Sequence, residues 1–352
     1  MNNLDIIFTH PGGRGWAPVV RLAHLASDLL EARLLQYTDA GYTKALLARG
    51  LLPPLRGGRR RALVIAPSPV HLNALLEGVP LLSRYEAVAA WVIDSFWWER
   101  IPRIARKRGR LDFLYVTDGG DRDHWSEATG VDVQVLPWGT DTLRVEPVLK
   151  TVDLQRLGRQ PESWDDDVMT GLEAGEHGLV FKGRPRFEPT DLESQLHVDD
   201  ALGRAKFVLA FSNGMHDAGY THPVREYLTA RWVDSLAHGA VVAGVAPNSA
   251  AADYLLWAGA TLDLGGTNRA EGLARLKDAV AAWTPATAER NRSEARKRLD
   301  WRHRLKVISH DLELATPALE REASKLVCES LRPTEYPCRT LCPPGLKTLP
   351  ER

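Results

Sequence analysis

Residues 225–244 read REYLTARWVDSLAHGAVVAG and show the pattern on which the whole chain is built. Apolar positions recur at helical spacing, which predicts a helix over 225–238 that Gly239 ends. The apolar run that follows this glycine predicts a strand buried on both faces of a sheet. Glu226 and Asp234 stand eight positions apart, so we expect both carboxylates on one face of the helix.

The same alternation of short apolar runs and helical segments extends in both directions. The apolar runs are residues 5–8, 62–66, 87–93, 113–117, 133–136, 152–154, 178–181, 206–211 and 260–264. Helical spacing predicts a helix over 16–35, another over 267–283, and one long, Arg-rich helix over 286–314. Buried strands separated by helices are typical of parallel sheets covered on both faces. We therefore predict an α/β fold.

The pattern restarts after Glu146, which predicts two Rossmann-like halves that face each other across a cleft. Residues 1–145 form the first predicted domain and 146–315 the second, whose last helix is free to cross back to the first. Residues 330–352 form a Pro-rich tail without periodicity, and we expect it to be loosely ordered. Ligands of open α/β sheets bind at the carboxyl ends of the strands, so the loops there are the expected site.

The composition argues against several classes of protein. The 352 residues carry 45 Lys and Arg against 45 Asp and Glu, and this balance argues against a stable nucleic-acid partner. No apolar run is long enough to cross a bilayer, and the first residues lack the pattern of a signal peptide. The three Cys suit a reducing compartment, so we expect a cytoplasmic protein. No spaced His and Cys cluster predicts a metal site.

The 225–244 stretch resembles the donor-binding segment of GT-B glycosyltransferases, in particular the retaining enzymes of the group 1, or family-4-like, type. That segment has an acid, seven residues, a second acid, and then a glycine and a strand, as Glu226 and Asp234 are placed here. The resemblance implies that Glu226 is catalytic, beside the donor sugar, and that Asp234 binds the ribose hydroxyls of the nucleotide. The family's Gly-aromatic-Gly is replaced, so Thr229 and Arg231 are expected to contact the phosphates through their side chains.

Two further segments carry this resemblance at the predicted domain junction. Residues 136–141, LPWGTD, resemble the turn with which the family leaves its first domain. Gly158 and Arg159 resemble the Gly-Arg that opens the second domain, where the Arg neutralises the donor diphosphate. The family's Lys a few residues later is absent, so Lys182 or Arg184 is expected to supply the second positive charge.

A Gly-rich turn, HPGGRG at residues 10–15, lies between the first predicted strand and helix. In GT-B enzymes the equivalent loop closes over the donor phosphates, so Gly13 and Gly15 are predicted to bind the nucleotide-sugar through their backbone. An NAD fingerprint is the alternative, but Pro18 stands where its third glycine belongs. His222, four residues before the first acid, is also predicted at the donor phosphates.

The first half supplies the predicted acceptor side. Asp94 ends the run 87–93, and the resemblance implies that it is catalytic and faces the acceptor; the alternative role is a helix N-cap. Trp97 and Trp98 follow it as a candidate stacking platform, with core packing as the alternative. Asp118 ends the next strand and is predicted to point at the cleft.

These residues predict a glycosyltransferase that moves a sugar from a nucleotide-diphosphate sugar to an unidentified acceptor, with retention. The nucleotide sugar is a co-substrate, and neither a cofactor nor a metal is expected. The alternatives are a nucleotide-sugar epimerase of GT-B fold and a catalytically degenerate GT-B binding module. The basic helix over 286–314 leaves peripheral membrane contact or an anionic acceptor open, although a solvated face is favoured.

Overall fold

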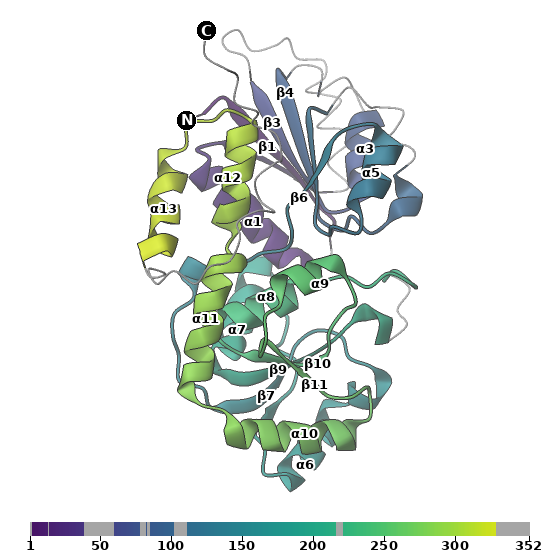
Figure 1. The fold of residues 1–352 in the computed structure, drawn as a ribbon, viewed down its shortest axis with the longest axis vertical. Helices are drawn as coiled ribbons and strands as arrows, with labels where there is room; N and C mark the ends of the chain where they lie inside the picture. Colours follow the sequence, from purple (N-terminus) through teal and green to yellow (C-terminus); the bar gives the residue numbers. More distant parts are fainter. Residues whose placement is uncertain are drawn as a thin grey trace, which may run out of the picture.

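The computed structural model describes residues 2–12, 14–38, 60–77, 82, 85–101, 111–215 and 221–328. The predicted tail at 330–352 lies outside the described residues. Two parallel sheets lie at opposite ends of an elongated molecule, one in each half of the chain (Figure 1). The predicted α/β fold with two Rossmann-like halves is therefore confirmed.

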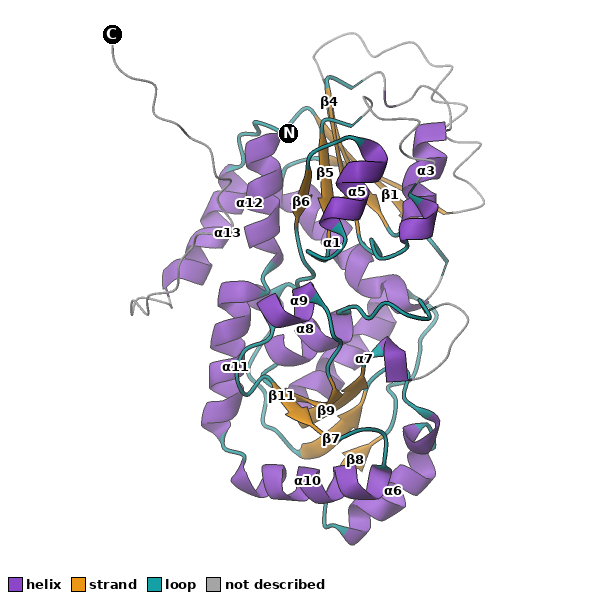
Figure 2. Ribbon diagram, turned by 45° about the vertical axis from the view of Figure 1, so that its right-hand side comes forward, coloured by secondary structure: helices purple, strands orange, loops and turns teal. Residues whose placement is uncertain are grey.

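The first sheet has six parallel strands in the order β2-β1-β3-β4-β5-β6. These are β1 (Leu4–His10), β2 (Arg33–Thr38), β3 (Arg61–Ala66), β4 (Ala87–Val92), β5 (Phe113–Val116) and β6 (Val133–Val135). Strand β1 pairs on both sides and places Ile7 opposite Leu35 of β2 and Val64 of β3. Helix α1 (Ala17–Leu29) covers one face, and α3 (Pro69–Glu77) and α5 (Arg122–Thr129) cover the other (Figure 2). Both faces are apolar because both are covered.

The second sheet has five parallel strands in the order β11-β10-β9-β7-β8. These are β7 (Val152–Arg156), β8 (Phe181–Lys182), β9 (Ala205–Phe211), β10 (Val241–Val245) and β11 (Thr261–Asp263). Its helices are α6 (Asp167–Glu176), α7 (Asp191–Arg204), α8 (Ala230–Ala237), α9 (Ala250–Leu255) and α10 (Arg269–Ala282). Helices α6 and α10 lie at the end of the molecule away from the first sheet, whereas α8 and α9 face it (Figure 2).

Three helices follow the second sheet: α11 (Pro285–Arg298), α12 (Trp301–Asp311) and α13 (Pro317–Cys328). Helix α11 packs beside the second sheet, and α12 and α13 lie beside the first (Figure 1). The Tyr115 hydroxyl of β5 donates a 2.7 Å hydrogen bond to Asp311 of α12. One apolar cluster of buried residues runs from α1 through α8 and α11 to α12, so the two halves share a core. The remaining short helices are η1 (Arg14–Trp16), η3 (Trp98–Arg100), η4 (Thr142–Arg144), η5 (Glu162–Trp164) and η6 (Asn213–Met215).

Three predicted helices have different bounds in the structure. The first ends at Leu29, and the chain turns through Glu31, whose φ of 49° is left-handed, into strand β2. The helix predicted over 225–238 begins only at Ala230, and the one predicted over 286–314 is interrupted at Asp300. In each case a local turn or side-chain hydrogen bonds override the helical spacing of the apolar residues.

The late start of α8 has a specific cause. Two backbone amides just before it, those of Val224 and Arg225, donate to Nδ1 of His222, at 3.1 and 2.9 Å. The amide of Tyr227 donates to Oδ1 of Asn213 at 3.2 Å. These hydrogen bonds hold residues 224–227 in a loop. Glu226 therefore precedes α8, and the expectation that Glu226 and Asp234 share a helix face is wrong.

The break between α11 and α12 fastens the segment that joins the two sheets. Asp300, which is fully buried, accepts hydrogen bonds from the amide and hydroxyl of Thr142 and from the amide of Arg302. Thr140 forms a parallel bridge with Asp300, and the Arg304 guanidinium donates to the carbonyls of Pro137 and Trp138 at 3.1 and 3.0 Å. We call this network the Asp300 clamp.

We predict that Asp300→Ala lowers the free energy of unfolding by about 3 kcal/mol, because it leaves the buried Arg302 guanidinium without one of its carboxylates and removes the N-cap of α12. Asp278→Ala, on the exposed side of α10, is the control and should change stability by less than about 0.5 kcal/mol. Urea unfolding of both variants measures this, and equal effects would contradict the clamp.

Close packing at the clamp gives a second stability prediction. A Cβ at Gly139 would lie 2.5 Å from the carbonyl oxygen of Leu299 and 2.9 Å from the Trp301 ring. Gly139→Ala should therefore cost about 1–3 kcal/mol of unfolding free energy. The matched change Gly175→Ala, where a Cβ meets nothing within 4 Å inside α6, should stabilise the protein by about 0.5 kcal/mol.

Candidate functional site

The strand order of the second sheet locates its switch point. From β7 the chain continues to β8 on one side of it and then crosses to β9 on its other side. The strand order therefore reverses between β7 and β9. Ligands of doubly wound sheets bind at this point, beyond the carboxyl ends of the strands. The loop after β7 turns at Gly158, whose φ is +72°, and the loop after β9 begins at Ser212. We call this region the β7–β9 switch point.

Two arginines meet at the β7–β9 switch point. The Arg231 guanidinium, from the first turn of α8, donates a 3.0 Å hydrogen bond to the carbonyl of Arg159. It also lies over Gly158, where a Cβ would be 3.2 Å from its Nη1. Arg159 in turn hydrogen-bonds to the hydroxyl of Tyr227, whose pKa is raised to about 12, first by burial and then by the charge of Asp94. Arg159 and Arg231 therefore place two positive charges at the β7–β9 switch point.

Asp94 reaches this group from the first domain. Its backbone amide donates to the carbonyl of Pro67 at 2.9 Å, which fixes the loop at the carboxyl end of β4. Burial raises the pKa of Asp94 to about 7, and the positive charge of Arg159 opposes that rise. A carboxyl group with this pKa gains and loses a proton near neutral pH, as a general acid or base must. The structure thus brings the predicted residues Asp94, Arg159 and Arg231 together.

Glu226 lies across the carboxyl ends of β9 and β10. Its Oε2 accepts hydrogen bonds from the Ser212 hydroxyl and, at 2.9 Å, from the backbone amide of Asn248. Its other oxygen approaches Gly214, where a Cβ would be 3.0 Å away. Thr229 occupies the N-cap position of α8 but makes no capping bond, and its buried Oγ1 has no partner among the described residues. This hydroxyl remains available to a ligand.

Asp234 lies within α8, beyond the loop that holds Glu226, and is buried. It accepts a hydrogen bond from Thr140, and burial raises its pKa to about 7, with Arg21 opposing and Asp199 adding to the rise. Together with Arg21, Arg144 and α1 residues, Asp234 lines a cavity of about 380 Å³ beside the interdomain segment. We call this cavity the linker pocket. The two predicted acids therefore have separate surroundings.

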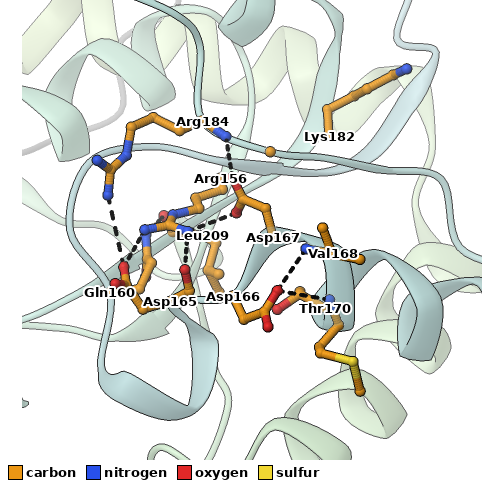
Figure 3. Close-up of polar contacts among 12 residues, drawn as sticks. Arg156, Gln160, Asp165, Asp166, Asp167, Val168, Thr170, Lys182, Arg184 and Leu209 are labelled. Atoms are coloured by element: carbon orange, nitrogen blue, oxygen red, sulfur yellow. Dashed lines mark hydrogen bonds and ion pairs between the residues drawn. The ribbon is translucent and has the colours of Figure 1, made fainter.

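Lys182 and Arg184 lie at the end of edge strand β8, next to an acidic group (Figure 3). The Arg184 guanidinium is 3.8 Å from Asp165, and its amide donates to Asp167 at 3.0 Å. Both acids also bind the buried Arg156 guanidinium at the end of β7. Lys182 is exposed and points away from this group in Figure 3. Arg231 hydrogen-bonds to the Arg159 loop, whereas Arg184 is held beside Asp165 and Asp167.

Trp98 is enclosed at the contact between the domains. The guanidinium of Arg225 lies over one ring face at 3.7 Å, and the His124 ring stacks on Trp98 at 3.5 Å. The indole Nε1 donates to Asp121 at 2.6 Å, and Arg225 also donates to Glu99 at 2.7 Å. In this arrangement Trp98 contacts Arg225 of the second domain and His124 and Asp121 of the first.

The other predicted residues near this contact are similarly engaged. The His222 ring lies 5.1 Å from that of Trp97, whose centroid is also 4.1 Å from the Arg100 guanidinium. Asp118 accepts a 2.9 Å hydrogen bond from the amide of Ala251, at the start of α9 in the other domain. These side chains hold the carboxyl edges of the two sheets together.

The glycine-rich turn is described only in part. Gly13 lies outside the described residues, whereas Gly15 is exposed, and a Cβ there would meet nothing within 4 Å. His10, at the end of β1, forms a 2.7 Å contact with Asp191 at the start of α7. The carboxyl end of β1 therefore also faces the second domain.

The sequence prediction missed Tyr227, which stacks on Phe96 of the first domain with ring centroids 3.7 Å apart. Its position next to Glu226 was the available signal.

Within the described part of the chain, no group of three or more His, Cys, Asp or Glu residues could hold a metal ion. No helix there is both long and apolar enough to cross a membrane.

Comparisons with known proteins give structural likeness only. No protein-family model matches the chain, and no curated protein matches its sequence. S. aureus TarM is 9% identical with a TM-score of 0.41, over 75% of this chain and 55% of that one. S. aureus MnaA bound to UDP is 12% identical with a TM-score of 0.47, over 90% and 98%. A putative UDP-N-acetylglucosamine 2-epimerase from Listeria monocytogenes is 12% identical with a TM-score of 0.48, over 90% and 99%.

The raised pKa of Asp94 predicts a pH-dependent effect of Asp94→Asn. Between pH 4 and 7 the unfolded chain loses this proton while the folded protein keeps it, so wild-type stability falls relative to the variant as pH rises. The stability difference, variant minus wild type, should increase through this window and level off above it. Urea unfolding at pH 4.5, 6 and 7.5 measures the difference, and a value independent of pH would disprove the burial of this carboxyl group.

Proposed function

We propose that this protein is a GT-B glycosyltransferase that uses a nucleotide-diphosphate sugar as donor. The observation that carries the proposal is the meeting of Arg159 and Arg231 at the β7–β9 switch point, opposite Asp94 of the first domain. A switch point that holds two guanidinium groups suits a diphosphate, because each group can bind phosphate oxygens through paired N–H donors.

Donor binding is assigned to the second domain. Arg159 and Arg231 bind the diphosphate, the buried hydroxyl of Thr229 donates to it, and the first turn of α8 turns its free N–H groups toward it. Of the cations that the sequence offered beside Arg159, we assign this role to Arg231 rather than to Lys182 or Arg184. The ribose contact of Asp234 is a separate part of the proposal, since this residue lines the linker pocket.

The proposed chemistry uses the two carboxylates differently. Positive charge at Arg159 and Arg231 stabilises the diphosphate as it leaves, which lowers the activation barrier of transfer. Both charges are already in place, so the protein does not have to reorganise during the reaction. Asp94, with a pKa of about 7, takes the proton of the acceptor hydroxyl. Glu226, held by Ser212 and the Asn248 amide, lies beside the donor sugar and accepts hydrogen bonds from its hydroxyls. Retention and metal independence come from the family resemblance.

Calorimetric titration with UDP, GDP, ADP and TDP tests donor binding. One nucleotide should bind, and Arg159→Gln and Arg231→Gln should each weaken it at least tenfold, or about 1.4 kcal/mol. Lys182→Gln is the matched control, because it removes a positive charge from β8 of the same sheet. This variant should bind the nucleotide like the wild type. Failure of all four nucleotides to bind would support the binding-module alternative instead.

The pKa of Asp94 also favours a second candidate, a nucleotide-sugar epimerase, because the same carboxyl group suits proton exchange at a sugar carbon. Incubation with nucleotide sugars in D₂O, without any acceptor, separates the two functions. An epimerase incorporates solvent deuterium into the recovered sugar, whereas a transferase returns it unlabelled. In either case Asp94→Asn should reduce turnover by at least a hundredfold.

A further inference from the structure

The linker pocket lies where α1 of the first domain meets the second domain. Its lining comes from α1, from the interdomain segment, from α7 and α8, and from Trp301 at the start of α12. Arg21 of α1 donates to Asp199 of α7 at 2.7 Å across this junction, which Figure 1 shows between the two sheets. The volume of about 380 Å³ falls in the range of small-molecule sites, and such sites are common between domains.

Large apolar side chains from three elements line the linker pocket. These are Val20 and Leu25 of α1, Leu192 of α7 and Trp301 of α12. Trp301 is buried, and its ring packs edge-to-face against that of Trp91 with centroids 5.3 Å apart, which fixes its position. This lining suits a ligand with a hydrocarbon or aromatic body.

The charged residues of the lining are compensated, with one exception. Three of them are paired with partners outside the lining, each at 2.7 Å: Arg21 with Asp199, Asp141 with Arg302, and Asp191 with His10. Asp28 and Arg144 are exposed and carry opposite charges, and His24 is exposed as well. Among the described residues, Asp234 is the one buried ionisable group of this lining, and it has no ion pair.

The surroundings of Asp234 lack a positive charge of their own. The residue is 5% exposed and accepts a hydrogen bond from Thr140. Burial raises its pKa to about 7; the Thr140 hydrogen bond and the charge of Arg21 oppose this rise, and the charge of Asp199 adds to it. The Arg21 guanidinium is already held by Asp199. A buried carboxylate is costly unless it is paired, so this group gains most from a ligand that brings a positive charge.

We propose that the linker pocket binds a small organic amine in its protonated form, with the ammonium group on Asp234 and the apolar body against Leu192 and Trp301. An ammonium group donates up to three hydrogen bonds and supplies the positive charge that this carboxylate lacks. The site goes beyond the proposed donor site and does not depend on it, since Arg159 and Arg231 are not part of its lining. Both domains line the pocket, so the bound amine stabilises their arrangement.

Titration calorimetry of the 352-residue chain at pH 8 tests this site with three probes of similar size: phenethylamine, phenethyl alcohol and 3-phenylpropionate. At this pH the amine is protonated and Asp234 is mostly ionised. Phenethylamine should bind, whereas the neutral alcohol and the anionic propionate should bind about tenfold more weakly or worse, because neither brings positive charge. Failure of phenethylamine to bind, or equally tight binding of the alcohol, would overturn the proposal.

Three variants locate the bound amine. Asp234→Asn keeps the shape of the side chain and should weaken phenethylamine binding by about tenfold or more. Asp28→Asn is the matched control, because it removes a carboxylate from an exposed position of the same lining, and it should bind like the wild type. Leu192→Ala shortens a side chain that is 59% exposed, so the core is undisturbed, and it should weaken binding by about threefold.

Two further measurements complete the test. Circular dichroism and thermal unfolding at pH 8 should show Asp234→Asn folded and no less stable than the wild type, because the change removes a buried charge and keeps an acceptor for Thr140. Titration of the same variant with the nucleotides distinguishes an amine from a ribose. Weakened nucleotide binding with unchanged phenethylamine binding would assign Asp234 to the ribose and overturn the proposal. Equal loss of the amine in Asp28→Asn and Asp234→Asn would also overturn it, since overall charge would then explain binding.

Discussion

The buried carboxylate of Asp300 fixes how the two halves of the molecule meet. It caps α12 and binds Thr142 of the interdomain segment and Arg302 of the same helix, so the chain between the sheets cannot move without breaking a charged network. Removing one partner from such a network leaves a buried charge uncompensated, and this cost keeps the arrangement rigid. The shared apolar core from α1 to α12 forms around this connection. The position of Asp94 relative to Arg159 depends on it.

A second set of contacts joins the carboxyl edges of the two sheets. Arg225 and Trp98 pair across the domains, Tyr227 stacks on Phe96, and Asp118 accepts from the first turn of α9. These aromatic and charged side chains, from loops at the carboxyl ends of the strands, thus hold the two domains together. Tyr227 belongs to this set and also hydrogen-bonds to Arg159, so the interdomain contacts continue into the β7–β9 switch point.

The sequence predicted much of this architecture because buried parallel strands are continuous apolar runs, and these appear without any knowledge of their neighbours. It failed at 225–229, where Asn213 and His222 bind the backbone groups that a helix would use. Both residues lie outside the predicted helix, so its own apolar spacing contains no sign of them. Of the predicted cations, Arg231 hydrogen-bonds to the Arg159 loop, and that contact depends on where α8 begins.

By itself, the sequence determined the two-sheet α/β fold, because strand periodicity is a local property. It also offered Glu226, Asp94, Arg159 and Arg231 as candidates, through the resemblance of short motifs to those of a known family. Tertiary structure alone decided which of them meet. The pKa of Asp94 is one example: burial raises it, and the Arg159 guanidinium group of the other domain opposes that rise. Burial and cross-domain distance are set by packing between segments far apart in the chain, and no local pattern encodes them.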